Sequence, residues 1–403
     1  MEYIYIALFA LIGSLAFGIL YLIRLDKGLY LQDLRLFFLL SFSLYSLFLP
    51  IGQCVFPEIL KFNTDIMSRT IWLYATAVIG FDIMIVKYKT PWRNADFCYA
   101  RNKSFMSIII ALVILVAYAF YYMYSQGVTT FALGESMDDR SVYGGAVHQS
   151  WIVLTIVVAT FFNYLLFHFK LLKPRYKLIF IACLLFYVAY QVSLGNRREY
   201  TTIILFFICY YLCIKRQPLK LKLFLFILAA FIGSFAITLV RDSNTRDLQG
   251  SEAVQIALVS NEFIYPQQTT YFTLMQDWDL RFGYTYTILP IEVAIPRSLY
   301  PNKPPTLGTE FVYMLRGSQG YAYTPVTEAY LNFGYIGPFL IFMLLGAGAN
   351  KLIMRTNKNG ITFLYIMSYA YIFDFCRGEF SSVSYSLFFI YLSYKAIRKL
   401  SKL

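Results

Sequence analysis

Three arginines in one long polar segment are the residues best suited to chemistry. Arg241, Arg297 and Arg316 fall within residues 241–325, the only long interruption of an otherwise apolar chain. The planar guanidinium group recognises phosphate through two parallel hydrogen bonds, whereas lysine acts as a point charge. These arginines predict a site for an anion, a phosphate or a pyrophosphate. The alternative for each is a role in loop folding or at the lipid headgroups.

Two short turns carry further arginines. One contains Arg197 and Arg198, and the other contains Arg377 with Asp374 and Glu379. An arginine in the middle of a membrane helix costs about 2.5–3.5 kcal/mol on insertion scales. The arginines therefore either lie at the headgroups or line a polar cavity under the large loop. We predict the cavity, in which all three would bind the anion.

Two glutamates, Glu310 and Glu328, are candidates for a catalytic base. A hydroxyl group that attacks a carbon centre loses its proton, and a positioned carboxylate can accept it. The alternative for either glutamate is an ion pair with a loop arginine. The only histidines, His148 and His168, do not suggest a metal site, and Asp138-Asp139 is interpreted as a solvated turn. No metal and no cofactor is predicted.

The composition is that of a polytopic membrane protein. Of 403 residues, 59% are hydrophobic and only 14% are charged. The net charge of +13 raises nucleic-acid binding as an alternative, but the basic residues are spread between apolar runs instead of gathering in one polar domain. Topology-setting charge explains them better, so no nucleic-acid partner is expected.

Apolar runs long enough to cross a bilayer recur along the chain. A spanning helix needs about 20 mostly apolar residues, and about eleven runs reach or approach this length. They are residues 3–23, 36–55, 66–86, 104–124, 150–169, 177–195, 199–214, 221–240, 326–350, 360–376 and 381–397. The expected fold is an all-α membrane bundle in three parts: helices 1–8 over residues 1–240, a large, partly helical periplasmic loop over 241–325, and helices 9–11 with a cytoplasmic tail over 326–403.

Alternate loops hold most of the 35 lysines and arginines, for example Lys87, Lys89 and Arg93 in one loop and Lys170 and Lys173 in another. Basic residues accumulate on the cytoplasmic side of a membrane protein. The pattern therefore predicts an N-terminus outside the membrane and a cytoplasmic C-terminus, with residues 241–325 on the outer face.

The large loop combines two kinds of structure. Residues 252–278 carry apolar side chains at helical spacing, including Leu258, Phe263 and Leu274, which predicts an amphipathic helix on the membrane surface. The stretch 295–308, IPRSLYPNKPPTLG, is too rich in proline for a regular helix. It predicts a stiff, defined loop.

Motifs in this loop and in the helix after it point to one family. They are IPR at 295–297, PNKP at 301–304 and Gly308, then TP at 324–325, EAYLNFG at 328–334 and Gly337. Ten residues separate Arg297 from Gly308. The whole pattern, including this Arg-then-Gly spacing, resembles the Wzy family of O-antigen and oligosaccharide repeat-unit polymerases.

The resemblance implies a glycosyltransferase of the bacterial inner membrane with a GT-C-like bundle. Its substrate would be an oligosaccharide on undecaprenyl pyrophosphate. A non-reducing-end hydroxyl of a new unit would attack the anomeric carbon of the growing chain, releasing the lipid pyrophosphate and extending an O-antigen-type surface polysaccharide. Arg241, Arg297 and Arg316 would stabilise the leaving group, and Glu328 or Glu310 would serve as base. A flippase and a chain-length regulator of the same pathway would be partners, besides membrane lipid.

Two other functions remain open. An O-antigen ligase also carries a large periplasmic loop, but it relies on a histidine there, and residues 241–325 contain none. A flippase for lipid-linked oligosaccharides would show internal repeats and short loops. No repeat is visible in this sequence, and its loops are unequal.

Overall fold

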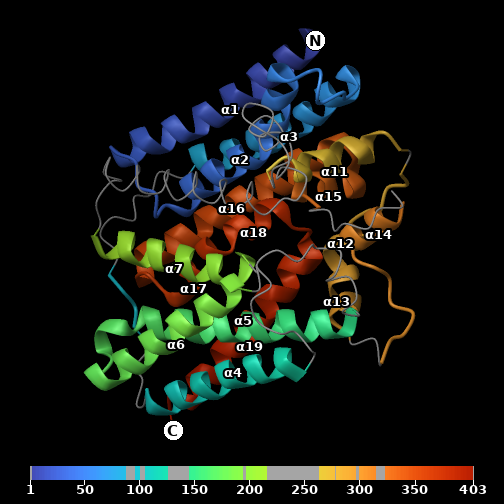
Figure 1. Cartoon of the computed structure of the whole chain (residues 1–403). Coiled ribbons are helices and arrows are strands. Elements are labelled where there is room, and N and C mark those ends of the chain that lie inside the picture. Colours follow the sequence, from blue (N-terminus) through green and yellow to red (C-terminus); the bar gives the residue numbers. More distant parts are fainter. Residues whose placement is uncertain are drawn as a thin grey trace, which may run out of the picture. The chain divides into compact units, whose positions relative to one another are not determined.

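A computed structural model describes residues 2–87, 96–99, 105–125, 145–193, 197–215, 263–276, 278–295, 299–314 and 323–402. This described part is helical, apart from one isolated parallel bridge between Phe97 and Ile361. The helices, labelled in Figure 1, are α1 (Glu2–Asp26), α2 (Leu34–Val55), α3 (Thr64–Lys87), α4 (Met106–Ser125), α5 (Gly145–Phe167), η2 (Phe169–Leu171), α6 (Pro174–Ser193), α7 (Arg197–Lys215), α11 (Tyr265–Leu274), α12 (Tyr284–Thr287), α13 (Leu289–Ala294), α14 (Leu307–Met314), α15 (Pro325–Phe333), η3 (Gly334–Ile336), α16 (Gly337–Asn359), α17 (Phe363–Ala370), α18 (Ile372–Arg377) and α19 (Phe380–Leu400).

Several of these helices are long and apolar enough to cross a membrane. They are Glu2–Asp26, Leu34–Val55, Thr64–Lys87, Ser150–Phe167 and Pro325–Asn359, with shorter apolar helices over Met106–Tyr122 and Tyr200–Lys215. The all-helical membrane fold expected from the sequence is thereby confirmed. The predicted span 221–240 lies outside the described residues, and the count of about eleven spans stays a prediction.

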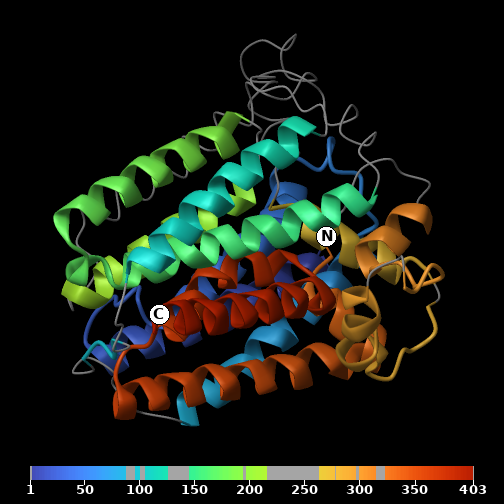
Figure 2. The same cartoon turned by 90° about the horizontal axis from the view of Figure 1, so that it is seen from below.

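The chain forms two compact units. The first consists of Met1–Asn94, Arg216–Lys358 and Ile372–Ser382, and the second of Ala95–Lys215, Asn359–Tyr371 and Val383–Leu403. In the second unit α4 packs against α5 and α6, and α7 packs against α5 and α17. Figure 2 shows α4 and α5 running side by side. The predicted three-part division of the chain stays a prediction.

The predicted span 360–376 is wrong as one continuous helix. Helix α17 ends at Ala370 and α18 begins at Ile372, because Tyr371 leaves ideal helical geometry at φ −92° and ψ −3°. This break coincides with the passage of the chain from the second unit to the first.

In the first unit, α1, α2 and α3 pack together, and α11 lies against α2, α3 and α15. The contact between α11 and α2 is built around a proline. Pro50 lies inside α2 and has no N–H, so the carbonyl oxygen of Ser46 lacks its helical donor. The Gln267 side chain of α11 replaces it: its Nε2 donates to Ser46 O at 2.6 Å, and its Oε1 accepts from Leu49 N at 3.2 Å.

The helix predicted over 252–278 is confirmed for Tyr265–Leu274, but its predicted position on the membrane surface is wrong for these residues. In α11 the residues without solvent contact include Gln267, Thr269, Thr270 and Thr273, so the polar side chains face the protein interior. The threonine hydroxyls donate to carbonyls of their own helix, for example Thr269 to Pro266 O at 2.6 Å. Satisfied in this way, a polar helix can be buried, and periodicity alone did not reveal it.

This geometry predicts the effect of Gln267→Leu. The substitution leaves the Ser46 carbonyl buried and unpaired, at roughly 1–3 kcal/mol. We expect a lower thermal midpoint in detergent than for the wild type. The neighbouring Gln268→Leu is the matched control and should unfold near the wild-type temperature. Equal midpoints for the two variants would contradict the role assigned to Gln267.

Candidate functional site

The structure describes some of the predicted site residues and not others. Arg241, Arg297 and Arg316 lie outside the described residues. Arg197 and Arg198 open α7, and nothing is described of their side chains. Arg377 ends α18, Glu310 lies in α14 and Glu328 lies in α15, all in the first unit.

The TP and EAYLNFG motifs form α15 and its boundaries. Thr324 caps the helix, because its hydroxyl accepts from the backbone N–H three residues ahead at 3.0 Å, and Pro325 suits the first turn. The helix ends where Gly334 adopts φ 63° and ψ −152°, a backbone conformation almost confined to glycine. A Cβ atom at Gly337 would overlap the Ala329 carbonyl. These requirements explain the NFG and Gly337 elements.

A hydroxyl network fixes the start of α15 to the bundle. Thr327 Oγ1 lies 2.6 Å from Thr270 Oγ1 of α11 and 2.8 Å from Thr324 Oγ1. Tyr74 of α3 reaches the same group, with its hydroxyl 3.3 Å from Thr270 Oγ1. The helix that carries Glu328 is thus attached to both α3 and α11.

The carboxyl group of Glu328 lies at the centre of the candidate site. The residue has no solvent contact, and its Oε2 accepts a hydrogen bond from Phe380 N at 2.6 Å. Its Oε1 is buried without a hydrogen bond from the described residues, although the Thr285 hydroxyl is nearby. One oxygen is therefore anchored by a backbone N–H, and the other lies near the Thr285 hydroxyl.

Asn332 holds the preceding loop against α15, one turn after Glu328. Its Nδ2 donates to Thr285 Oγ1 and to Glu328 O, both at 2.7 Å. Its Oδ1 accepts from Gly283 N at 2.9 Å. The asparagine of the NFG element thus has a structural role: it places Thr285 beside the carboxyl group of Glu328.

Two tyrosines surround this carboxyl group, and with Glu328 they are called here the Glu328 cluster: Glu328, Tyr286 and Tyr323. The Tyr286 hydroxyl is buried without a hydrogen bond from the described residues, and the buried Tyr323 hydroxyl lies near the Thr273 hydroxyl. Burial raises the pKa of each phenol well above its ordinary value, and the charge of Glu328 adds to this. Both phenols therefore remain protonated at neutral pH and can donate a hydrogen bond.

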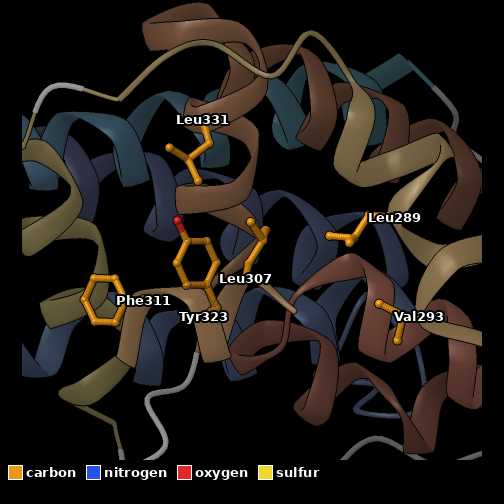
Figure 3. Close-up of a cluster of buried hydrophobic side chains, with 6 residues drawn as sticks. All are labelled: Leu289, Val293, Leu307, Phe311, Tyr323 and Leu331. Carbon is orange, nitrogen blue, oxygen red and sulfur yellow. The ribbon is translucent and has the colours of Figure 1, made fainter. Parts of the chain in front are cut away.

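An apolar cluster supports Tyr323. It consists of Leu289, Val293, Leu307, Phe311, Tyr323 and Leu331, from α13, α14, α15 and the segment before α15. Figure 3 shows the Tyr323 hydroxyl pointing toward the helix that carries Leu331. Burial of each large apolar side chain contributes roughly 1.5–3 kcal/mol, so this cluster stabilises the packing of α13 and α14 against α15.

Glu310, the other candidate base, has a cationic partner. Its Oε1 accepts from Arg281 Nη2 at 2.6 Å, and the Arg281 guanidinium also lies over the Trp278 ring, 5.7 Å from its centroid. This ion pair is the alternative role that the sequence left open for Glu310. Its role as a base stays a prediction.

Lys303 of the PNKP element folds inward. The residue is 5% exposed, and its Nζ donates to Val293 O and to Ile295 O, each at 3.0 Å. These carbonyls lie at and just after the last turn of α13, where a positive charge is favourable. The lysine therefore links residue 303 to the C-terminal end of α13.

The turn between α18 and α19 approaches this loop from a distant part of the chain. Glu379 is 5% exposed, and its Oε2 accepts from Gly308 N at 3.0 Å while its Oε1 accepts from Ser382 Oγ at 3.2 Å. Arg377, in the last turn of α18, lies with its Nε 3.8 Å from Asp374 Oδ1. The glycine of the Arg-then-Gly spacing is thus held by a carboxyl group in this turn.

Sequence reasoning named Glu328, Glu310 and Arg377 but missed several residues that build the site. Asn332 and Lys303 lay inside the quoted motifs, so the resemblance marked them without giving a role. Tyr286 and Tyr323 carried no signal that distinguishes them from the 36 tyrosines of the chain. Within the described residues, no group of three His, Cys, Asp or Glu side chains could hold a metal ion.

The fold and the site define a multi-pass membrane protein with a buried carboxyl group under a folded loop. The family model of the O-antigen polysaccharide polymerase Wzy matches residues 2–402. The chain therefore belongs to this family, whose members act on lipid-linked oligosaccharide units in the membrane. Searches of curated proteins and of solved structures found no match.

Burial of Glu379 predicts a pH-dependent stability. Burial raises the pKa of its carboxyl group, although hydrogen bonds from Gly308 N and from neighbouring hydroxyls oppose the shift; the nearby titratable group is Glu328. A raised pKa in the folded state means that stability is fully present below the ordinary glutamate pKa of about 4. It is lost as the pH rises through the raised value.

Glu379→Gln removes this ionisation. We expect the thermal midpoint of the variant, measured relative to the wild type in detergent, to increase from pH 5 to pH 8. Asp65→Asn, at an exposed carboxylate, is the control and should follow the wild-type profile. A difference between Glu379→Gln and wild type that stays constant or shrinks over this range would contradict the burial account.

Proposed function

We propose that the protein polymerises undecaprenyl-pyrophosphate-linked oligosaccharide repeat units into an O-antigen-type polysaccharide at the periplasmic face of the inner membrane. The hydroxyl oxygen at the non-reducing end of a new unit forms a bond to the anomeric carbon of the growing chain. The bond between that carbon and the pyrophosphate oxygen breaks, and undecaprenyl pyrophosphate leaves with the electron pair. The hydroxyl proton passes to a base.

The structural observation that carries this proposal is the buried carboxyl group of Glu328. It lies in the TP and EAYLNFG motifs, has one oxygen anchored by Phe380 N, and faces two protonated phenols. A base must have a fixed position and a free oxygen. We assign Glu328 as the base, with Tyr286 and Tyr323 as hydrogen-bond donors that orient the acceptor sugar.

The arginines supply positive charge for the leaving group. Negative charge builds up on the pyrophosphate as the glycosidic carbon is transferred, so fixed cations stabilise the transition state. Arg241, Arg297 and Arg316 take this role in the proposal, and Arg197, Arg198 and Arg377 bind pyrophosphate or glycan. The charge that these arginines provide makes a metal ion unnecessary, and we propose a metal-independent reaction.

The proposed topology places the N-terminus in the periplasm and the C-terminus in the cytoplasm. It is supported by the lysines and arginines of alternate loops. The lipid-linked unit would be delivered by a flippase, and a chain-length regulator of the same pathway would limit the polymer. Both partners are proposals that follow from the reaction.

Glu328→Gln tests the base directly. The amide oxygen can still accept from Phe380 N, but the side chain can no longer take a proton, so the rate of polymerisation should fall by about 10²–10⁴-fold. The measurement is the glycan ladder of cells in which the gene is deleted and restored as each variant at equal protein level. Glu292→Gln, at a half-buried carboxyl group of the same loop that Tyr284 contacts, is the control and should restore the full ladder.

A full ladder with Glu328→Gln would rule out Glu328 as the base. If Glu310→Gln then abolished the ladder, the base would be Glu310, and the ion pair with Arg281 would position it. Loss of the ladder with both variants would leave Glu328 as the base and Glu310 as the anchor of Arg281.

Arg297 is tested in the same cells. Arg297→Ala and Arg297→Lys should both leave a single repeat unit, because lysine cannot reproduce the bidentate contact. Arg69→Lys, in an exposed pair with Asp65, is the control and should restore the ladder. A normal ladder with Arg297→Ala would remove Arg297 from the site.

The wild type and the deletion decide the reaction class. Deletion should reduce the ladder to one repeat unit. Full-length lipid-linked chains that accumulate without surface glycan would indicate a ligase instead, and single lipid-linked units that accumulate on the cytoplasmic face would indicate a flippase. Either result would contradict the proposed polymerase.

A further inference from the structure

We infer that Glu379 is a positioning residue for the polymerisation reaction. It fixes the position of the segment that follows Arg297, at Gly308, relative to the carboxyl group of Glu328. This inference rests on the proposed function. It concerns a residue to which the sequence motifs gave no role, in a turn far from both glutamate-bearing helices in the chain.

The first contact joins this turn to α14. Glu379 Oε2 accepts from Gly308 N at 3.0 Å across a sequence separation of 71 residues. Gly308 is the second residue of α14, so its N–H is one of the first-turn donors without a partner inside the helix. A carboxyl oxygen at that position satisfies the donor and fixes where the helix begins.

The second contact joins the same turn to α15. Phe380, the residue after Glu379, donates its N–H to Glu328 Oε2 at 2.6 Å. Two consecutive residues of one turn therefore hold the start of α14 and the candidate base. Movement of this turn would displace both partners together, and loss of the Glu379 contact would uncouple them.

The third contact fixes the other end of the proline-rich stretch. Lys303 Nζ donates to Val293 O and Ile295 O, which ties residue 303 back to the end of α13. The stretch from Ile295 to Gly308, which includes Arg297, is thus attached at its start, at Lys303 and at Gly308. Of these three attachments, only the contact at Gly308 is made by a residue whose neighbour, Phe380, also contacts Glu328.

Folding of this region does not depend on Glu379 alone. Leu307 and Phe311 of α14 pack in the apolar cluster with Leu331 of α15, which holds the two helices together without the carboxyl group. Loss of the Gly308 contact should therefore change the placement of α14 and not its presence. A misplacement of about 1 Å can cost on the order of 100-fold in rate.

The test compares three variants of Glu379 in the purified, full-length protein reconstituted in vesicles with a lipid-linked repeat unit. Glu379→Gln keeps an oxygen for Gly308 N and an amide that can donate to Ser382. Glu379→Asp keeps the charge but is one methylene too short to reach. Glu379→Ala removes the contact. The kcat and KM of lipid pyrophosphate release are measured, with thermal midpoints.

We expect Glu379→Gln to retain most of kcat, and Glu379→Asp and Glu379→Ala to lose about 10–100-fold in kcat with little change in KM, since a positioning contact acts on the reacting geometry and not on substrate affinity. Asp65→Asn, at an exposed carboxylate, should match the wild type. Even if the Ala variant does not fold, the Gln and Asp variants distinguish the effect of side-chain length, which sets the contact with Gly308 N, from the effect of the negative charge.

The inference is overturned if Glu379→Gln is as slow as Glu379→Ala, or if Glu379→Asp is as fast as the wild type, because the effect would then follow charge. It is also overturned if the wild type polymerises and all three variants match it, an outcome that leaves the proposed function intact. If the wild type releases no lipid pyrophosphate and forms no polymer, the proposed function itself fails, and this inference fails with it.

Discussion

Burial of the Glu328 carboxyl group is the constraint on which the rest of the site depends. A carboxylate removed from water is costly unless donors or charges compensate it. The protein places Phe380 N, at the start of α19, 2.6 Å from one of its oxygens, where the helix dipole also favours negative charge. Two phenols and the Thr285 hydroxyl surround the group.

The supports of that carboxyl group come from both the bundle and the loop. From the bundle, Tyr74 reaches the hydroxyl network at the start of α15, and Gln267 joins α11 to the proline kink in α2. From the loop, Asn332 places Thr285, and the apolar cluster packs α13 and α14 against α15. Side chains such as Gln267 and Asn332 hydrogen-bond buried backbone groups, which a membrane environment favours. The polar loop is therefore built as a continuation of the helical bundle and not as an independent domain.

Sequence alone predicted the features that are local. Apolar length predicted the long helices. The TP and NFG elements form the ends of α15, although the predicted span over 326–350 ran through NFG without a break. The surface position predicted for the helix over 252–278 was wrong because α11 is buried by long-range polar contacts. Gln267 contacts Ser46, 221 residues away, and Thr270 contacts Thr327, 57 residues away. The Glu379 contact with Gly308, and the pairing of Arg281 with Glu310, are likewise long-range. No local pattern encodes them, so the sequence could name Glu310 but not choose between its two roles.

The central claim, that this chain joins lipid-linked repeat units through the leaving of a lipid pyrophosphate, is tested most directly with purified protein in vesicles that contain one defined undecaprenyl-pyrophosphate-linked unit, a metal chelator and no other protein. Mass spectrometry would follow the glycan, and a phosphate assay would follow the lipid. We predict products at integer multiples of the unit mass, with one undecaprenyl pyrophosphate released for each new linkage. Units that remain single while the protein is folded and the lipid is accessible, or products that form without release of lipid pyrophosphate, would contradict the account.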